Sequence, residues 1–418
     1  MTKEELLQLE SQVRYRLDRE LNTSTMGNDE LRAAIENIIV RELAGRYLTL
    51  NQRLMVVDEV YASYRGFGGL LDIIMQDDSI TEVMVNGPKN IFVERDGKLV
   101  RYEREFKDED ELVKVIRLIV GKVNKEITVA DPIKDARLPD GSRVNAVLSP
   151  IALDGATLTI RKFSSKPMTI ERLIQYGSIT PKIAEFLEKL VCARFNIFVS
   201  GGTGSGKTTF LNALSNYIPA DERVITIEDS AELQIKNVPN LVRLETRNAT
   251  SSSDKEITIR DLIKSSLRMR PDRIIVGEVR GGEALDMLQA MNTGHDGSLS
   301  TGHANSAKDM LRRLETMVKQ GSVDLPLESI RNQIESSVDI IIHLSRLRDR
   351  SRKTLTISEV SGFMPNGEVR LNHLFEFRET AQSTNEKVIG NLVRTENPIG
   401  ERTREKLFRA GFTEKDLI

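Results

Sequence analysis

A glycine-rich segment followed by a lysine and two threonines is the first candidate for chemistry in this sequence. Its core satisfies the pattern G-x4-G-K-[ST]. Glycines let backbone N–H groups wrap a β-phosphate, the N-terminus of a following helix adds positive charge, and the lysine reaches the β and γ oxygens. The hydroxyl of Thr208 is suited to bind Mg²⁺. The sequence therefore predicts an ATP-phosphate site formed by Gly201, Gly202, Thr203, Gly204, Ser205, Gly206, Lys207, Thr208 and Thr209.

The flanking sequence supplies the strand and the helix that such a loop requires. The apolar run Phe195–Ser200 predicts a strand before the loop, and Gly206–Ile218 predicts a helix that begins at its last glycine. This context distinguishes a phosphate-binding loop from a glycine-rich turn that binds nothing.

Two carboxylates lie at the ends of other predicted strands. Glu228 lies near the end of Arg223–Asp229, and Glu278 near the end of Arg273–Val279. Because the carboxyl ends of neighbouring parallel strands face the same crevice, both side chains can approach a γ-phosphate. We expect Glu228 to polarise water and Glu278 to serve the Mg²⁺ shell. The alternative is that these acids are ordinary strand-end charges or helix caps.

Two histidines, His295 and His303, are each flanked by glycine. A neutral imidazole near a γ-phosphate can sense it by hydrogen bonding. Loop histidines that bond only to backbone are the alternative. A metal site is not indicated, because no cysteine or third histidine lies nearby.

The composition limits the class of protein. The chain has 418 residues, 39% of them hydrophobic, and its 60 Lys+Arg against 62 Asp+Glu give a net charge of −2, without the basic excess of a nucleic-acid binder. Its single cysteine, Cys192, cannot form an internal disulfide. The charged start Met1–Glu10 differs from a signal peptide, and no apolar run approaches the roughly 18 residues of a membrane span. We therefore expect a soluble protein of the reducing cytoplasm.

Patterning divides the chain into parts. In the later half, strands alternate with helices, which implies βαβ units, a mainly parallel sheet and the α/β class. Before it, hairpin signals at Asp96-Gly97 and Asp140-Gly141 flank a predicted helix, Asp108–Val123. The expected organisation is a helical segment over 1–65, a small α+β domain over 66–163, a linker over 164–170, the phosphate-site domain over 171–378, and a polar, weakly patterned tail over 379–418.

Taken together and in this order, these elements resemble the secretion ATPase superfamily of type II secretion, type IV pili and type IV secretion. They are most similar to the CpaF-like ATPases of tight-adherence (Flp) pili. Ile80–Gly87, Leu138–Asn145 and Leu158–Phe163 resemble that family's N-terminal domain, and Glu278–Ala284 and Met291–Ser298 resemble its core.

The resemblance implies a RecA-like P-loop core behind a PAS-like N-terminal domain. The loop then corresponds to Walker A, Ile227–Leu233 to the Asp box, Asp272–Glu278 to Walker B and Gly294–His303 to the His box. Gly302 departs from the family, which more often has an apolar residue there.

The resemblance also implies a homo-hexameric ring in which ATP sits between the two domains and basic residues complete the site. Arg137, Arg143, Arg161 and Arg280 are the candidates for that role, and surface ion pairing is the alternative for each. Such a motor would act peripherally at the cytoplasmic membrane with inner-membrane platform proteins.

Several functions compete. A hexameric motor for pilus assembly, pilus retraction or secretion is the first, with type IV export of substrate or DNA as the alternative within the superfamily. A P-loop kinase would need a substrate lid and an acceptor pocket, and the large domain before the loop argues against it. A RecA-type DNA motor is disfavoured by the neutral charge balance. The lone cysteine excludes the four-cysteine zinc element of the type II secretion ATPases.

Overall fold

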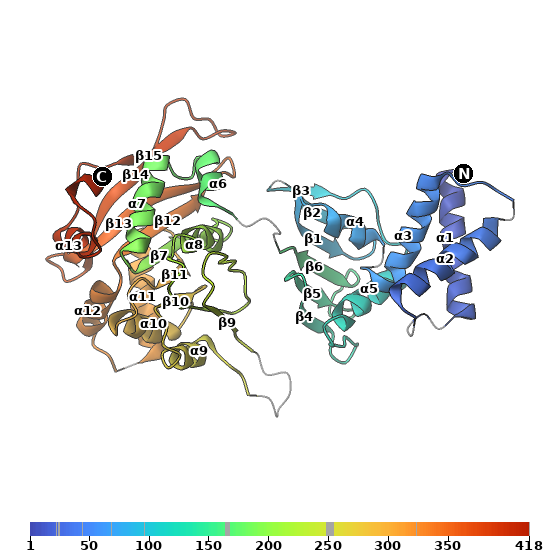
Figure 1. The fold of residues 1–418 in the computed structure, drawn as a ribbon, viewed down its shortest axis with the longest axis horizontal. Coiled ribbons are helices and arrows are strands. Elements are labelled where there is room, and N and C mark those ends of the chain that lie inside the picture. The colour runs from blue at the N-terminus through green and yellow to red at the C-terminus, as the bar shows by residue number, and fades with distance from the viewer. Residues whose placement is uncertain are drawn as a thin grey trace. The chain divides into compact units, whose positions relative to one another are not determined.

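The computed structural model describes residues 1–21, 23, 26–43, 45–67, 69–95, 97–163, 168–247, 255–322 and 324–417. The chain divides into two compact units, Met1–Ser165 and Lys166–Ile418 (Figure 1). The division falls within the expected linker, of which residues 164–167 lie outside the described residues, as does Asp96 of the first expected hairpin turn.

The first unit begins with a helical bundle of α1 (Lys3–Glu20), α2 (Asn28–Leu43) and α3 (Leu50–Arg65). Thr2 and Thr49 start α1 and α3 with capping boxes, which satisfy N–H groups that a helix start leaves unpaired. Apolar side chains from the three helices form one buried cluster, which includes Leu17, Ile35 and Val60. Helices were expected over this stretch.

A mixed sheet and helix layer completes the first unit. Its elements are α4 (Leu70–Gln76), β1 (Ile80–Asn86), β2 (Ile91–Arg95), β3 (Lys98–Arg101), α5 (Glu109–Gly121), β4 (Ile133–Arg137), β5 (Arg143–Val147) and β6 (Thr157–Arg161). The strands pair antiparallel in the order β3-β2-β1-β6-β5-β4. Asp108 caps α5, whose buried side chains pack on the sheet.

The second unit is built on a large, mainly parallel sheet, as the α/β prediction requires. Its strands lie in the order β15-β14-β13-β12-β7-β11-β10-β8-β9. The part of the sheet from β12 to β9 in this order is parallel, and β13, β14 and β15 are antiparallel. In chain order its elements are α6 (Ile170–Gln175), α7 (Pro181–Cys192), β7 (Ile197–Gly201), α8 (Lys207–Ser215), β8 (Val224–Glu228), β9 (Leu241–Glu245), α9 (Ile259–Ser266), β10 (Arg273–Val276), α10 (Glu283–Asn292), β11 (Leu299–His303), α11 (Ala307–Gly321), α12 (Leu327–Ser337), β12 (Ile340–Arg346), β13 (Arg352–Phe363), β14 (Val369–Glu379), β15 (Gly390–Arg394), α13 (Glu401–Arg409) and the short helix η1 (Glu414–Asp416).

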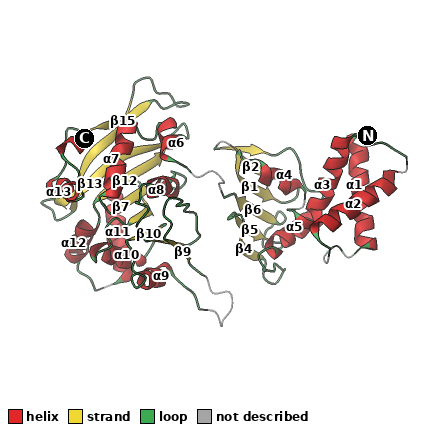
Figure 2. Cartoon of the chain, viewed as in Figure 1, coloured by secondary structure: helices red, strands yellow, loops and turns green. Residues whose placement is uncertain are grey.

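Helices cover both faces of this sheet (Figure 2). One buried cluster joins the sheet to α7 and α8, and another joins it to α9, α10, α11 and α12. Burial on both faces explains why β7 and β10 are apolar throughout.

Some elements were not predicted from the sequence. Strand β11, Leu-Ser-Thr-Gly-His, is small and polar, yet Leu299, Ser300 and Thr301 are fully buried between β7 and β10. The residues after Glu379, which look only polar and weakly patterned, contain β15 and α13, and Leu407 of α13 joins the main core. The sequence pattern of β11 is weak because its buried side chains are small and polar, and that of β15 and α13 is weak because few of their side chains are buried.

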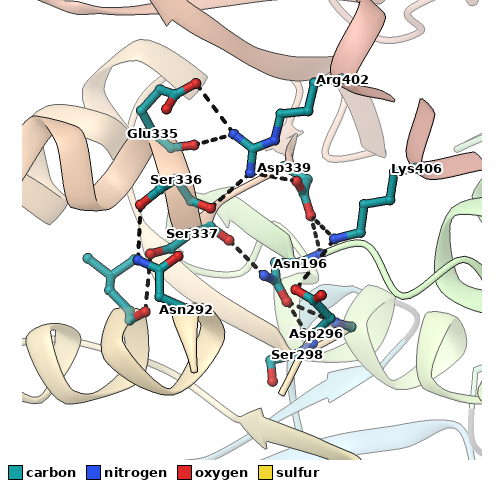
Figure 3. Close-up of polar contacts among 12 residues, drawn as sticks. Asn196, Asn292, Asp296, Ser298, Glu335, Ser336, Ser337, Asp339, Arg402 and Lys406 are labelled. Atoms are coloured by element: carbon teal, nitrogen blue, oxygen red, sulfur yellow. Dashed lines mark hydrogen bonds and ion pairs between the residues drawn. The ribbon is translucent and has the colours of Figure 1, made fainter. Parts of the chain in front are cut away.

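A polar network fastens α13 to the amino ends of the parallel strands (Figure 3). Asp339, which is 3% exposed just before β12, accepts hydrogen bonds from Arg402 (3.0 Å), Lys406 (2.8 Å) and the backbone N–H of Asn196 (2.9 Å). The side-chain oxygen of Asn196 in turn accepts from the backbone N–H of Ser298, ahead of β11 (3.0 Å). One carboxylate therefore links α13 to the starts of β7, β11 and β12.

We expect Asp339→Ala to destabilise the second unit by about 3 kcal/mol, because it leaves the buried N–H of Asn196 without its acceptor and removes a buried carboxylate from Arg402 and Lys406. Urea unfolding measures this. Asp296→Ala is the matched control, since Asp296 pairs with Lys406 at a largely exposed position and should cost less than about 1 kcal/mol. Equal effects of the two substitutions would contradict the role given to Asp339.

Candidate nucleotide site

The loop between β7 and α8 has the backbone conformation of an anion-binding turn. Gly204 (φ +71°) and Gly206 (φ +92°) adopt the left-handed region that side chains disfavour, and α8 begins at the next residue, Lys207. The Ser205 hydroxyl donates to the carbonyl oxygen of Gly202 (2.8 Å) and closes the loop. Backbone N–H groups at the start of α8 can therefore surround a phosphate.

Lys207 lies across its own loop. Its side chain is 7% exposed, and Nζ donates to the carbonyl oxygen of Gly202 (3.2 Å) and lies 3.3 Å from Nδ1 of His303. Burial lowers the pKa of Lys207 from its ordinary value. An anion arriving in the loop would supply the charge partner that this amine needs.

The pairing of β11 brings His303 to this loop. Within the sheet, β11 lies between β7 and β10, and His303 is directly opposite Gly201. Nε2 of His303 lies 2.8 Å from Oε1 of Glu278, and burial is the main cause that lowers the pKa of the imidazole. The hydroxyl of Thr301 donates to the carbonyl oxygen of Gly277 (2.8 Å) and fixes the turn that carries Glu278.

Glycine before His303 has a packing reason. A Cβ at Gly302 would lie 2.7 Å from Cε of Met310 and 3.0 Å from the ring of Phe198. Met310 and Phe198 therefore occupy the space that a side chain at this position would need.

Arg280 extends the cluster on the far side of Glu278. It donates from Nε (2.9 Å) and Nη2 (2.7 Å) to Oε2 of Glu278, and Nη1 lies 3.8 Å from Asp229. Lys207, His303, Glu278 and Arg280 thus form one continuous line of polar side chains beside the loop, with a cation at each end.

Glu228 is buried at the end of β8, with 3% of its surface exposed. Its Oε1 accepts from the backbone N–H of Glu232 (2.8 Å) and Leu233 (3.0 Å), whereas among the described residues Oε2 has no hydrogen-bond partner. Burial raises the pKa of Glu228 to about 7. A carboxyl that titrates near neutral pH and has one open oxygen suits acid–base chemistry with water.

The structure does not bring His295 to the loop. His295 precedes β11, whereas His303 ends it, so the two lie at opposite edges of the parallel sheet. Nδ1 of His295 lies 3.3 Å from the carbonyl oxygen of Ala290. This contact corresponds to the alternative of a loop histidine bonded to backbone.

In the first unit, antiparallel pairing aligns three candidate arginines. Arg143 lies directly opposite Arg137 on β4 and Arg161 on β6, and Glu82 of β1 lies opposite Arg161. Directly opposite residues share one face of a sheet, and like charges in that arrangement are destabilising. The register therefore forms a cationic row on that face.

Sequence reasoning missed residues on the other side of the loop. The Ser200 hydroxyl lies 2.9 Å from Nδ1 of the buried His343 on β12, and Arg352 of β13 donates from Nε to the carbonyl oxygen of Gly204 (2.9 Å). The repeated arginines in Arg346–Arg352 were the available signal.

The fold and the site define a RecA-like P-loop ATPase. Residues 68–402 match the family described as "Type II/IV secretion system protein". The chain belongs to this family.

Named relatives agree with the family. The type IV secretion system protein VirB11 of Brucella suis is 36% identical over 296 residues, 65% of this chain and 82% of that protein. The conjugal transfer protein TrbB of Rhizobium radiobacter is 34% identical over 303 residues, 72% of this chain and 89% of that protein. A protein of Methanocaldococcus jannaschii is 47% identical over 239 residues, 56% of this chain, which span only 33% of that protein.

Among solved structures, the ATPase DotB of Yersinia pseudotuberculosis aligns with a TM-score of 0.51 at 16% identity, covering 70% of this chain and 77% of that chain. This likeness supports the fold.

Glu228 should make stability depend on pH. Its raised pKa means that the folded protein holds a proton between pH 4.5 and about 7, so the stability linked to this proton is lost as pH rises through about 7. Glu228→Gln does not titrate and should gain up to about 3 kcal/mol relative to the unsubstituted protein between pH 5 and 8.

Urea unfolding of the nucleotide-free protein at both pH values tests this expectation. Glu396→Gln, the same substitution at an exposed position, is the control and should show no such gain. A difference between Glu228→Gln and the unsubstituted protein that does not change with pH would refute the buried titration.

Proposed function

We propose that this ATPase is a hexameric motor that couples ATP hydrolysis to assembly or retraction of a type IV or Flp pilus, or to secretion. The observation that carries the proposal is the cluster of Lys207, His303 and Glu278 beside the loop between β7 and α8. This cluster provides a phosphate cradle together with the groups that hydrolysis needs.

Each residue of the site has a proposed role. Residues 201–209 hold the phosphates of ATP, and Thr208 and Glu278 would hold Mg²⁺, an ion that neutralises charge on the phosphates. Glu228 accepts a proton from the attacking water, and its open Oε2 is the atom available for this. Burial lowers the pKa of His303 and favours its neutral form. This imidazole forms a hydrogen bond with the terminal phosphate and so detects its presence.

Arg137, Arg143 and Arg161 are proposed to complete the site when ATP is bound. The strand register gathers the three arginines on one face of the sheet, which supports a role in contacting one anion together. Guanidinium groups are planar, permanently charged and able to grip phosphate with two N–H groups. Arg280 is already paired with Glu278 and is the remaining candidate.

The proposal also concerns which transport system the motor serves. The motifs resemble CpaF-like ATPases of Flp pili, whereas the similarity to VirB11 and TrbB favours type IV secretion as the alternative. Within the described residues, no helix combines the length and apolar content needed to cross a bilayer. We propose a cytoplasmic protein that associates peripherally with the membrane through platform proteins of the pilus or secretion system.

Lys207→Ala should lower ATP hydrolysis by at least about 10²-fold with the fold intact, because it removes a charge-assisted phosphate contact that strengthens in the transition state. Phosphate release measures the rate, and circular dichroism checks the fold. Hydrolysis within about tenfold of the unsubstituted protein would refute the assignment of the loop.

Measuring the size of the assembled protein with an ATP analogue tests the proposed class of protein. A ring of six rejects a P-loop kinase, and a stable monomer rejects the motor.

Arg143→Ala and Arg161→Ala should lower turnover of the assembled ring while assembly and nucleotide affinity change little. An arginine that stabilises the transferring phosphate can be worth about 10³-fold in rate. Steady-state ATPase assays measure this effect.

Arg95→Ala is the matched control in the same unit, since Arg95 forms a surface ion pair with Asp77 (2.6 Å). If neither Arg143→Ala nor Arg161→Ala slows turnover by more than about threefold, the arginine row is a structural feature of the sheet and not part of the site.

A further inference from the structure

The turn between β12 and β13 lies directly against the phosphate loop. Strand β12 pairs with β7 so that Leu344 is opposite Gly201, and Arg346 therefore continues past the end of β7, where the loop begins. A Cβ at Gly201 would lie 2.5 Å from the carbonyl oxygen of Leu344. The backbones thus approach more closely than a side chain would allow.

Two exposed arginines occupy this turn at the loop. Arg346 and Arg352 are direct cross-strand partners, so two like charges share one face of the hairpin. Arg352 donates from Nε to the carbonyl oxygen of Gly204, and its Cδ would lie 3.5 Å from a Cβ at Gly206. Nη1 of Arg346 would lie 3.9 Å from a Cβ at Gly204. Two guanidinium groups therefore lie beside the loop, and this side-chain type grips phosphate with its planar N–H groups.

The turn is held in place by its own contacts. The backbone N–H of Leu347 donates to the carbonyl oxygen of Ser351 (2.8 Å), and Asp349 accepts from the backbone N–H groups of Ser351 (3.0 Å) and Val388 (2.7 Å). Lys353 donates to the carbonyl oxygen of Gly177 (2.9 Å). The arginines are therefore presented from a fixed backbone, which limits the entropy lost on binding.

Sheet order decides which end of a nucleotide these arginines meet. Strands β11 and β10, which carry His303 and lead to Glu278, lie on one side of β7, and β12 and β13 lie on the other. The hydrolytic side chains mark the γ-phosphate side of the loop. The arginine pair is on the opposite side, where the α-phosphate and the nucleoside must lie.

We propose that Arg346 and Arg352 bind the α-phosphate end of a nucleotide held by the loop of the same subunit. The proposal rests on the proposed ATPase function of that loop. The hydrogen bond to Gly204 uses Nε of Arg352, and the guanidinium group has four further N–H donors, about the number that bidentate contact with a phosphate needs twice over. Because ATP and ADP share the α-phosphate, the pair sets the affinity for both and not the rate of hydrolysis.

Binding of ADP, a non-hydrolysable ATP analogue and inorganic pyrophosphate to Arg346→Ala and Arg352→Ala tests this. We expect the affinities for ADP and the ATP analogue each to fall about tenfold or more, with kcat at saturating ATP within about twofold. Pyrophosphate, which lacks an α-phosphate and a nucleoside, should bind as before. Arg352→Lys should recover part of the affinity, because it restores the charge but not the planar donor geometry.

Arg348→Ala is the matched control, because this substitution removes the same charge from the same turn. Arg348 contacts Glu379 and Thr384 instead of the loop. The substitution should leave all affinities unchanged. If the affinity for pyrophosphate falls by the same factor as the affinity for ADP, the arginines only shape the loop. If the affinity falls for the ATP analogue but not for ADP, the arginines lie at the γ-phosphate. Either result, or affinities within about twofold, overturns the proposal. If Lys207→Ala also leaves every affinity unchanged, the nucleotide site itself is refuted.

Discussion

The pairing of β7 with β11 on one side and β12 on the other is the constraint on which the rest of the second unit depends. With Gly201 opposite both His303 and Leu344, the end of β7 is fixed between two strands that carry polar groups to the loop. A shift of this register by one residue would turn every side chain of β11 to the other face. Burial of the sheet on both faces is what prevents such a shift.

The strands that end at the nucleotide site begin at the network around Asp339. Asn196, at the start of β7, bonds both to Asp339 and to the turn ahead of β11, so α13 is connected to the strands that carry the loop and His303. Parallel strands place all amino ends at one edge of the sheet and all carboxyl ends at the other. The C-terminal residues thus stabilise the scaffold at the edge opposite the chemistry.

Local sequence was sufficient for the parts of the protein whose backbone is determined locally. The glycines before Lys207 require a tight turn whatever surrounds them, and apolar runs ending in Glu228 and Glu278 predict buried parallel strands with carboxylates at one edge. The α/β class and the identity of the phosphate loop followed from these patterns, and the structure has the predicted parallel sheet. The helix start at Asp108 and the amphipathic face of α5 could also be predicted from the sequence.

Tertiary structure alone decided which distant residues meet. Two histidines with the same glycine flanks end at opposite edges of the sheet, because one precedes β11 and the other completes it, and β11 itself is too small and polar to be recognised. The alignment of Arg143 with its neighbours and the approach of Arg352 to Gly204 depend on strand register. By itself the sequence determined the loop, the strand-end acids and the fold class, since neighbouring residues encode backbone conformation and burial. Long-range pairing decided the electrostatic surroundings of the site, since it depends on how whole strands share hydrogen bonds and core.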